Sequence, residues 1–170
     1  YLADVSRLEA MLAAGSLLEL EGDYCWSLCF EERFVARLCY EGFLPICCDV
    51  GGSEMPGLYV LLPKLHEQRC VLLPPRLHIS RKVRRRARRY ILTVGRALPR
   101  VLHGCIAQHG VSWLYPPMQR LLLKLIAGCG VGGGHVRTVS FELWALPGGA
   151  SAGEFRDDLR LVAGDLGCVV

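Results

Sequence analysis

The segment SRKVRRRARRY, at positions 80–90, constrains the fold more than any other part of the sequence. Seven of its residues are basic and none is acidic. Charged side chains are almost never fully buried unless they are paired, so this segment must lie at the surface. Ser80 is a natural N-cap, and Val83, Ala87 and Tyr90 have the spacing of one helical face. The sequence predicts a helix that docks through this narrow stripe and presents seven cations outward: Arg81, Lys82, Arg84, Arg85, Arg86, Arg88 and Arg89.

The charges of the whole chain are separated along the sequence. Positions 68–141 hold 14 Lys and Arg and no acid, whereas the remainder holds 6 basic and 16 acidic residues. Such separation costs self-repulsion and is typical of a protein with a polyanion partner. A membrane-surface helix would need bulky apolar anchors opposite the charges, and a solvated face usually mixes signs. The pattern favours nucleic acid; a solvated face and an acidic lipid or protein are the alternatives.

Length and hydropathy are those of a small globular protein. The chain has 170 residues, of which 52% are hydrophobic, enough for one domain or two small ones. No apolar run approaches the ~18–20 residues that a membrane-spanning helix needs. We therefore expect a soluble cytoplasmic protein that is monomeric and does not associate with a membrane. The chain begins with Tyr1 rather than Met, which suggests a fragment or a processed chain.

Apolar periodicity and turn residues predict a mixture of helices and strands. A first helix ends at Gly15, and a second is capped by Ser27 and ends at Gly42. We expect Gly132–Gly134 to be a flexible connection; the surrounding GCGVGGG run lacks the strand and helix of a phosphate loop. The predicted strands and the later helices are Phe43–Cys48, Leu58–Leu62, Tyr90–Val94, Arg96–Gln108, a helix opening at Pro117, Val139–Trp144 and a strand within Leu159–Val170.

The cysteines do not form a recognisable metal-binding pattern. There are nine of them, with no C-x-x-C spacing. His103, Cys105 and His109 resemble metal ligands, but on a helix residues 105 and 109 share a face and residue 103 does not. We expect free thiols in a reducing compartment, no metal and no bound cofactor.

An ordered series of segments resembles the leucyl/phenylalanyl-tRNA–protein transferases. The segments are LHISRKVRRRARRYILTV, RALPRVLHGCIAQHG, SWLYPPMQRLL, VSFELW and LVAGDLG. The resemblance covers residues 65–170 and is thinner over 25–64, where VARLCYEGFLPIC matches. Two positions depart from the family: Ile46 and the run Leu61–Pro63 stand where it typically has tryptophans. These departures put the amino acid and the acceptor preferred by the family in doubt.

The resemblance implies an α+β fold with two parts. Residues 1–89 would form a small N-terminal α/β domain that ends in a basic tRNA-binding helix. Residues 90–170 would form the first half of an acetyltransferase-like (GNAT) mixed sheet with helices, which is incomplete. The predicted order of strand, helix, helix, strand, strand from residue 90 agrees with the first half of that fold.

The resemblance also implies an activity and its partners. The family moves Leu or Phe from an aminoacyl-tRNA, its co-substrate, to the N-terminal amine of an acceptor protein, which marks that protein for degradation. Trp113 would stack on the 3′-terminal adenosine, a contact of ~1–3 kcal/mol; a core tryptophan is the alternative. The family's catalytic groups match positions after Val170, and Glu142 matches a glutamate expected to give structural support.

Two other functions stay open at this point. An RNA-binding module that has lost the transfer reaction would keep the basic helix and Trp113. A CoA-dependent N-acetyltransferase would share the fold but needs a glycine-rich pyrophosphate loop, which the sequence lacks up to Val170.

Overall fold

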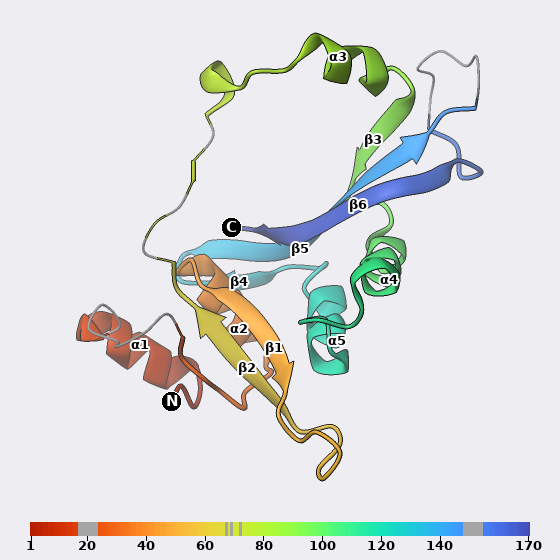
Figure 1. Cartoon of the computed structure of the whole chain (residues 1–170). Coiled ribbons are helices and arrows are strands. Elements are labelled where there is room, and N and C mark those ends of the chain that lie inside the picture. Colours follow the sequence, from red (N-terminus) through yellow and green to blue (C-terminus); the bar gives the residue numbers. More distant parts are fainter. Residues whose placement is uncertain (17–23, 67, 69, 72, 148–154) are drawn as a thin grey trace. The chain divides into compact units, whose positions relative to one another are not determined.

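The structure is a computed structural model that describes residues 1–16, 24–66, 68, 70–71, 73–147 and 155–170. The chain contains both helices and strands, in short runs of each, and the sheets are antiparallel (Figure 1). The chain is therefore a mixed α+β protein. Its elements are α1 (Val5–Ala13), α2 (Glu32–Tyr40), β1 (Leu44–Asp49), β2 (Tyr59–Lys64), η2 (Pro74–Arg76), α3 (Arg81–Ala87), β3 (Tyr90–Val94), α4 (Leu98–His109), α5 (Pro116–Lys124), β4 (Cys129–Val131), β5 (Gly134–Ala145) and β6 (Arg160–Val169).

The chain divides into two compact units that are discontinuous in sequence. The first comprises residues 1–67, 106–138 and 168–170, and the second comprises residues 68–105 and 139–167. Strand β5 contributes its first five residues to the first unit and the rest to the second. The predicted domains, 1–89 and 90–170, are a different division and stay a prediction.

The first unit is organised around helix α2. Its apolar residues Phe34, Val35 and Leu38 are buried, as expected from their periodic spacing. Strands β1 and β2 pair in antiparallel register, from Leu44 opposite Lys64 to Asp49 opposite Tyr59. The predicted strands and helix in this part are confirmed to within a few residues.

Ser27 does not cap α2, contrary to the sequence prediction. Helix α2 begins at Glu32, and Ser27 pairs instead with Leu61 of β2 through two backbone hydrogen bonds of 2.8 and 2.9 Å. Its hydroxyl accepts a hydrogen bond from the backbone N–H of Cys29. Strand pairing with a residue far along the chain outweighs the local capping preference.

Residues Gly132 and Gly133 form a tight turn rather than a flexible connection. Both have positive φ angles, 57° and 87°, and Val131 pairs with Gly134 across the turn. A two-residue hairpin with φ > 0 at both positions favours glycine strongly. The turn joins β4, which the sequence did not predict, to a strand β5 that begins earlier than expected.

The second unit contains an antiparallel arrangement of β3, the second half of β5, and β6. Tyr90 pairs with Ala145 and Val94 with Phe141. Ala97, Trp144 and Leu159 form a small buried cluster in this unit, against which Ile91, Phe155 and Leu161 pack. The predicted strands in this unit are confirmed.

Helix α4 packs closely on strand β6 within the second unit. A Cβ added at Gly164 would stand 2.7 and 2.9 Å from the two Cγ atoms of Val101, which is almost fully buried. Only glycine permits this approach without displacement of its neighbour.

Among the described residues, no helix is long and apolar enough to cross a membrane.

Candidate nucleic-acid interface

The basic helix α3 forms where the sequence predicts its start. The Oγ of Ser80 accepts a hydrogen bond of 3.3 Å from the backbone N–H of Val83, which satisfies one unpaired donor of the first turn. The helix is short, because it ends at Ala87 and β3 begins at Tyr90. The seven basic residues therefore occupy two helical turns and the two residues that follow.

The whole segment is exposed. Every residue from 73 to 89 is exposed, and no residue of α3 is buried. The predicted apolar stripe does not dock: Val83 is 56% exposed, Ala87 is also exposed, and Tyr90 belongs to β3 rather than to the helix. Valine and alanine offer little apolar area to bury, so they do not hold a helix that carries seven cations against a core.

The seven basic side chains of residues 81–89 are concentrated in one segment without an acidic partner. Within the described residues, none of them forms an ion pair, and no acidic residue lies in their own stretch of sequence. Elsewhere, Arg37 pairs with Glu41 at 2.8 Å and Lys124 with Glu32 at 3.0 Å. The basic surface of residues 81–89 is thus an uncompensated concentration of positive charge.

Trp113 lies in the connection between α4 and α5, in the first unit. It is half-buried, and the preceding Ser112 has a φ of 49°, in the left-handed region. Such a conformation in a non-glycine residue is uncommon and often marks a functional turn. The basic segment belongs to the second unit, so the seven cations lie together on α3 and the two residues that follow it, whereas Trp113 belongs to the first unit.

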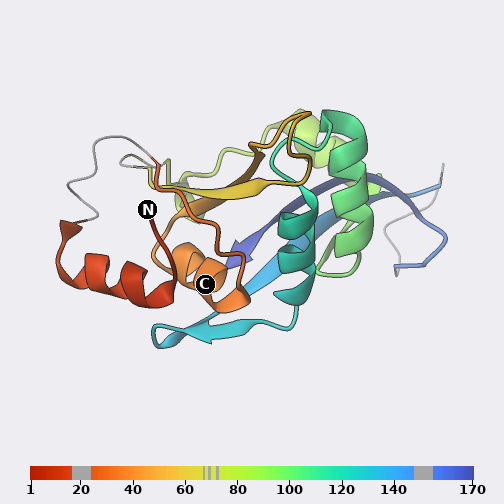
Figure 2. The ribbon, with the colours of Figure 1, turned by 90° about the horizontal axis from the view of Figure 1, so that it is seen from below.

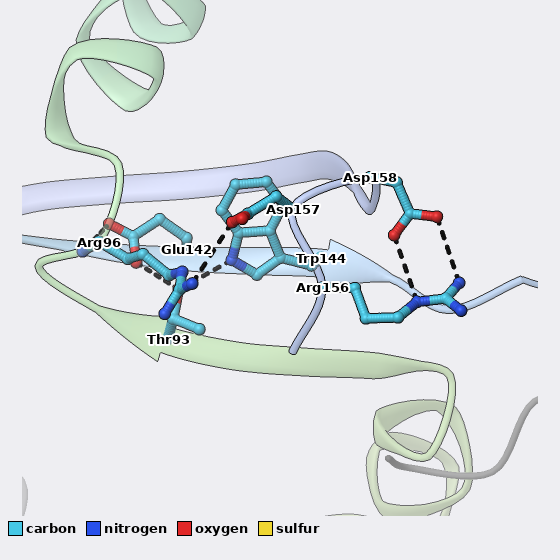
Figure 3. A network of polar contacts seen from close by, with 7 residues as sticks. All are labelled: Thr93, Arg96, Glu142, Trp144, Arg156, Asp157 and Asp158. Carbon is cyan, nitrogen blue, oxygen red and sulfur yellow. Dashed lines mark hydrogen bonds and ion pairs between the residues drawn. The ribbon is translucent and has the colours of Figure 1, made fainter. Parts of the chain in front are cut away.

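Glu142 is the centre of a buried polar network in the second unit (Figure 3). Its Oε1 accepts hydrogen bonds from the backbone N–H groups of Arg96 and Ala97, at 3.1 and 3.0 Å, and from the hydroxyl of Ser140 at 2.5 Å. Its Oε2 accepts a hydrogen bond of 2.5 Å from Thr93, its cross-strand partner. The carboxylate therefore joins β3, β5 and the start of α4.

This network determines what Glu142 can do chemically. Burial raises the pKa of its carboxyl group, but the hydrogen bonds from Ser140, Thr93, Ala97 and Arg96 outweigh that effect and hold the pKa below its ordinary value of 4.5. The ionised carboxylate binds the two amide groups that precede α4, at the end of the helix where its dipole favours negative charge. With both oxygens occupied and no exposed surface, Glu142 has a structural role.

The indole of Trp144 extends the same network. Its Nε1–H donates a 2.8 Å hydrogen bond to Thr93, and its ring packs edge-on against Phe155 at 5.0 Å. The guanidinium of Arg96 lies 3.8 Å from the centroid of the Phe155 ring, and that of Arg100 lies 4.8 Å from the Trp144 ring. These two arginines stack on aromatic rings, unlike the cations of α3.

Sequence patterns alone did not reveal this network. Glu142 was expected to give structural support, but its partners could not be predicted. Thr93, for example, lies 49 positions before Glu142, and the two residues meet only because their strands pair. Among the described residues, no three His, Cys, Asp or Glu side chains gather as metal ligands would.

Comparison with known proteins adds no relative. No protein-family model matches the chain, and no curated protein matches it.

Proposed function

We propose that the chain binds tRNA through the basic surface of residues 81–89. The observation that supports this proposal is the exposure of all seven cations without an acidic partner in the described residues. Guanidinium groups bind phosphate oxygens in a bidentate manner and orient a protein on a nucleic acid without reading its bases.

An anionic membrane is the other polyanion that the surroundings of α3 allow. Leu73, Leu77 and Ile79 are 50%, 49% and 42% exposed and precede the helix. They lie outside α3, whereas an interfacial helix carries its apolar anchors on the face opposite its charges. The helix itself offers only Val83 and Ala87, which favours nucleic acid over lipid.

The resemblance of the sequence to the leucyl/phenylalanyl-tRNA–protein transferases suggests the reaction in which the chain would use a bound tRNA. In the proposed function, the chain is part of a cytoplasmic aminoacyl-tRNA–protein transferase that moves Leu, Phe or a related amino acid from tRNA to the N-terminal amine of an acceptor protein. The second unit would form the first half of a GNAT-like sheet. The reaction is the attack of an amine on an ester, which requires a base to deprotonate the amine and donors for the developing oxyanion.

An RNA-binding module without transfer activity is the second candidate function. The seven exposed cations support it as well, because phosphate binding requires neither a base nor donors for an oxyanion. The two functions differ in one measurable property, which is whether binding depends on the amino acid attached to the tRNA.

The experiment measures binding of the chain to leucyl-tRNA, to uncharged tRNA, to a DNA duplex of similar length and to anionic phosphatidylserine vesicles, across a salt series. A protein that contacts six to ten phosphates loses about 10³–10⁵ in affinity between about 50 and 200 mM salt. Tighter binding of leucyl-tRNA than of uncharged tRNA supports the transferase.

The other outcomes separate the alternatives. Equal, strongly salt-dependent binding of the three nucleic acids favours the RNA-binding module. Binding of vesicles with no binding of RNA would overturn the proposed function.

A further inference from the structure

One face of the sheet in the second unit is apolar and exposed. Leu92 of β3 lies opposite Leu143 of β5, and Val94 lies opposite Phe141. Side chains directly opposite each other in an antiparallel pair share a face, as does every second residue along a strand. We call this side of the two strands the outer face. Its residues are Tyr90, Leu92, Val94, Phe141, Leu143 and Ala145.

The opposite face of the same two strands is already covered. It carries Thr93, Glu142 and Trp144, which form the polar network and part of the buried cluster. Helix α4 begins on this side, since Ala97 belongs to the same cluster. The helix lies below these strands in Figure 1 and in front of them in Figure 2, which looks from below.

The outer face is exposed although it carries no charged side chain. Leu92 is 64% exposed, Val94 56% and Phe141 43%. An antiparallel sheet with one face in water normally places polar residues on that face. Here the polar Thr93 and Glu142 lie on the covered face and the apolar residues lie on the exposed one. A contiguous exposed apolar surface of this kind marks an interaction site.

The charges next to the outer face are positive. Strand β3 follows residues 81–89 directly, and the backbone N–H of Leu146 donates a 2.9 Å hydrogen bond to the carbonyl of Arg89. The sequence from 68 to 141, which includes β3 and Phe141, contains no acid. A partner that is apolar along its length and acidic at one end would complement both properties.

We propose that the outer face binds an amphipathic helix of a partner protein, with acidic residues at the end of the helix that meets residues 81–89. A helix pairs its own backbone groups, whereas an extended segment laid flat on apolar side chains would leave its N–H and C=O groups unpaired. The five residues of β3 extend ~17 Å, the length of about eleven helical residues. A helix here, with α4 on the other face, completes a stable layered arrangement.

Two other occupants fit the outer face less well. A second copy of the chain would bring another seven cations to the interface, and like charges oppose association. An anionic membrane has the right charge, but interfacial binding buries apolar groups about 5–10 Å deep. Leu143 and Ala145 are half-buried in β5, which lies between β3 and β6, so this face is too flat to insert. The docking surface does not depend on the proposed RNA binding.

The experiment measures binding of dye-labelled synthetic peptides to the folded full chain by fluorescence anisotropy. The first peptide, about 15 residues long, has leucines on one helical face and glutamates at one end. The second has the same composition in an order that gives no apolar face, and the third has glutamines in place of the glutamates.

We expect the first peptide to bind and the second not to bind. The third should bind more weakly than the first at low salt, and this difference should shrink as salt is added. Equal binding of the first and second peptides would rule out a helix-specific surface. Equal binding of the first and third would rule out the acidic end of the partner.

Substitutions in the outer face locate the binding surface. Leu92→Thr keeps a residue that favours strands but removes apolar area, so the affinity for the first peptide should fall about tenfold. Phe141→Thr should act in the same direction. Met55→Thr is the matched control, because Met55 is 60% exposed and lies between β1 and β2 in the first unit, and it should leave the affinity unchanged. Unchanged affinity in Leu92→Thr would contradict the proposal.

Two measurements on the unmodified chain detect the other occupants. Sedimentation velocity reports a dimer, and flotation with phosphatidylserine vesicles reports lipid binding. Either one, if Leu92→Thr abolishes it and the first peptide does not bind, would overturn the proposal. Circular dichroism checks that each variant folds, and the three peptides test the proposal on the unmodified chain without any variant.

Discussion

Glu142 shows how much of the fold can depend on one side chain. It accepts hydrogen bonds from two strands and from the amide groups of Arg96 and Ala97, just before α4, and it is fully buried. Glu142→Gln keeps the size of the side chain but replaces one accepting oxygen by a donor, which then faces other donors. We expect a loss of about 2–3 kcal/mol in the free energy of unfolding.

Urea unfolding measures this loss as a lower midpoint at an unchanged slope. Glu54→Gln is the control, because Glu54 is an exposed loop residue, and it should leave the midpoint unchanged. Equal midpoints for Glu142→Gln and the unmodified chain would contradict the structural role of the carboxylate.

The contribution of Glu142 should also depend on pH in a fixed direction. Its folded pKa lies below the ordinary value of 4.5, so the ionised carboxylate stabilises the fold fully above that value. This contribution is lost as the pH falls through the folded pKa. The gap in midpoint between the unmodified chain and Glu142→Gln should therefore be complete at neutral pH and narrow in acid. A gap that stays constant or widens in acid would contradict the assigned direction.

The proposed stacking of Trp113 on the 3′-terminal base of the RNA can be tested by substitution. If its ring stacks on a terminal base, Trp113→Ala should weaken binding of tRNA with a free 3′ end by about 5- to 150-fold, from ~1–3 kcal/mol of stacking. Binding of a blunt RNA duplex should change little. Trp26→Ala is the matched control, since Trp26 is another accessible tryptophan of the first unit, 48% exposed. Equal losses on both RNAs would make Trp113 a residue of the fold alone.

At the scale of elements, α3 supplies the test of phosphate binding. We expect a fourfold charge reversal in the basic surface to weaken tRNA binding and to reduce the salt slope by roughly one for each phosphate contact removed. The four substitutions are Arg84→Glu, Arg85→Glu, Arg88→Glu and Arg89→Glu. Filter binding across a salt series measures both effects.

The control changes the total charge equally but elsewhere. It reverses four exposed arginines outside the basic surface: Arg7, Arg33, Arg120 and Arg137. If binding depends on local charge, this control keeps most of the affinity and the slope. Similar losses in both variants would show that only net charge matters.

The contact between α4 and β6 allows a comparison of two glycines on one strand. Gly164→Ala should destabilise the chain by about 1–3 kcal/mol, because its new methyl group meets the stiff, buried Val101. Gly167→Ala should leave stability unchanged or slightly higher, since nothing lies within 4 Å of the added Cβ. Thermal unfolding of both variants measures the difference, and equal melting temperatures would contradict the close packing.

At the scale of the whole molecule, local patterns predicted most elements and few of their contacts. The strand at Tyr90–Val94 and the capped start of α3 follow from nearby residues alone. The pairing of Ser27 with Leu61 and the network around Glu142 join distant segments, which periodicity does not report. The prediction that an apolar stripe docks α3 on the body of the protein was wrong. Periodicity gives the spacing of apolar residues, but it does not show whether their apolar area is large enough to hold a helix in place.

The hairpin turn between β4 and β5 is a second example of a local pattern that does not determine the structure. A run of glycines is typical both of a flexible connection and of a turn with positive φ angles. Only the pairing of Val131 with Gly134 distinguishes them at Gly132 and Gly133.

The unpaired cations of α3 have a thermodynamic consequence for any nucleic acid that they bind. A duplex holds a layer of condensed small cations, and each arginine that takes a phosphate releases some of them into solution. The favourable free energy is then largely the mixing entropy of the released ions. Titration calorimetry should accordingly find a small heat of association. In a living cell, the concentration of monovalent ions would then determine the lifetime of each complex.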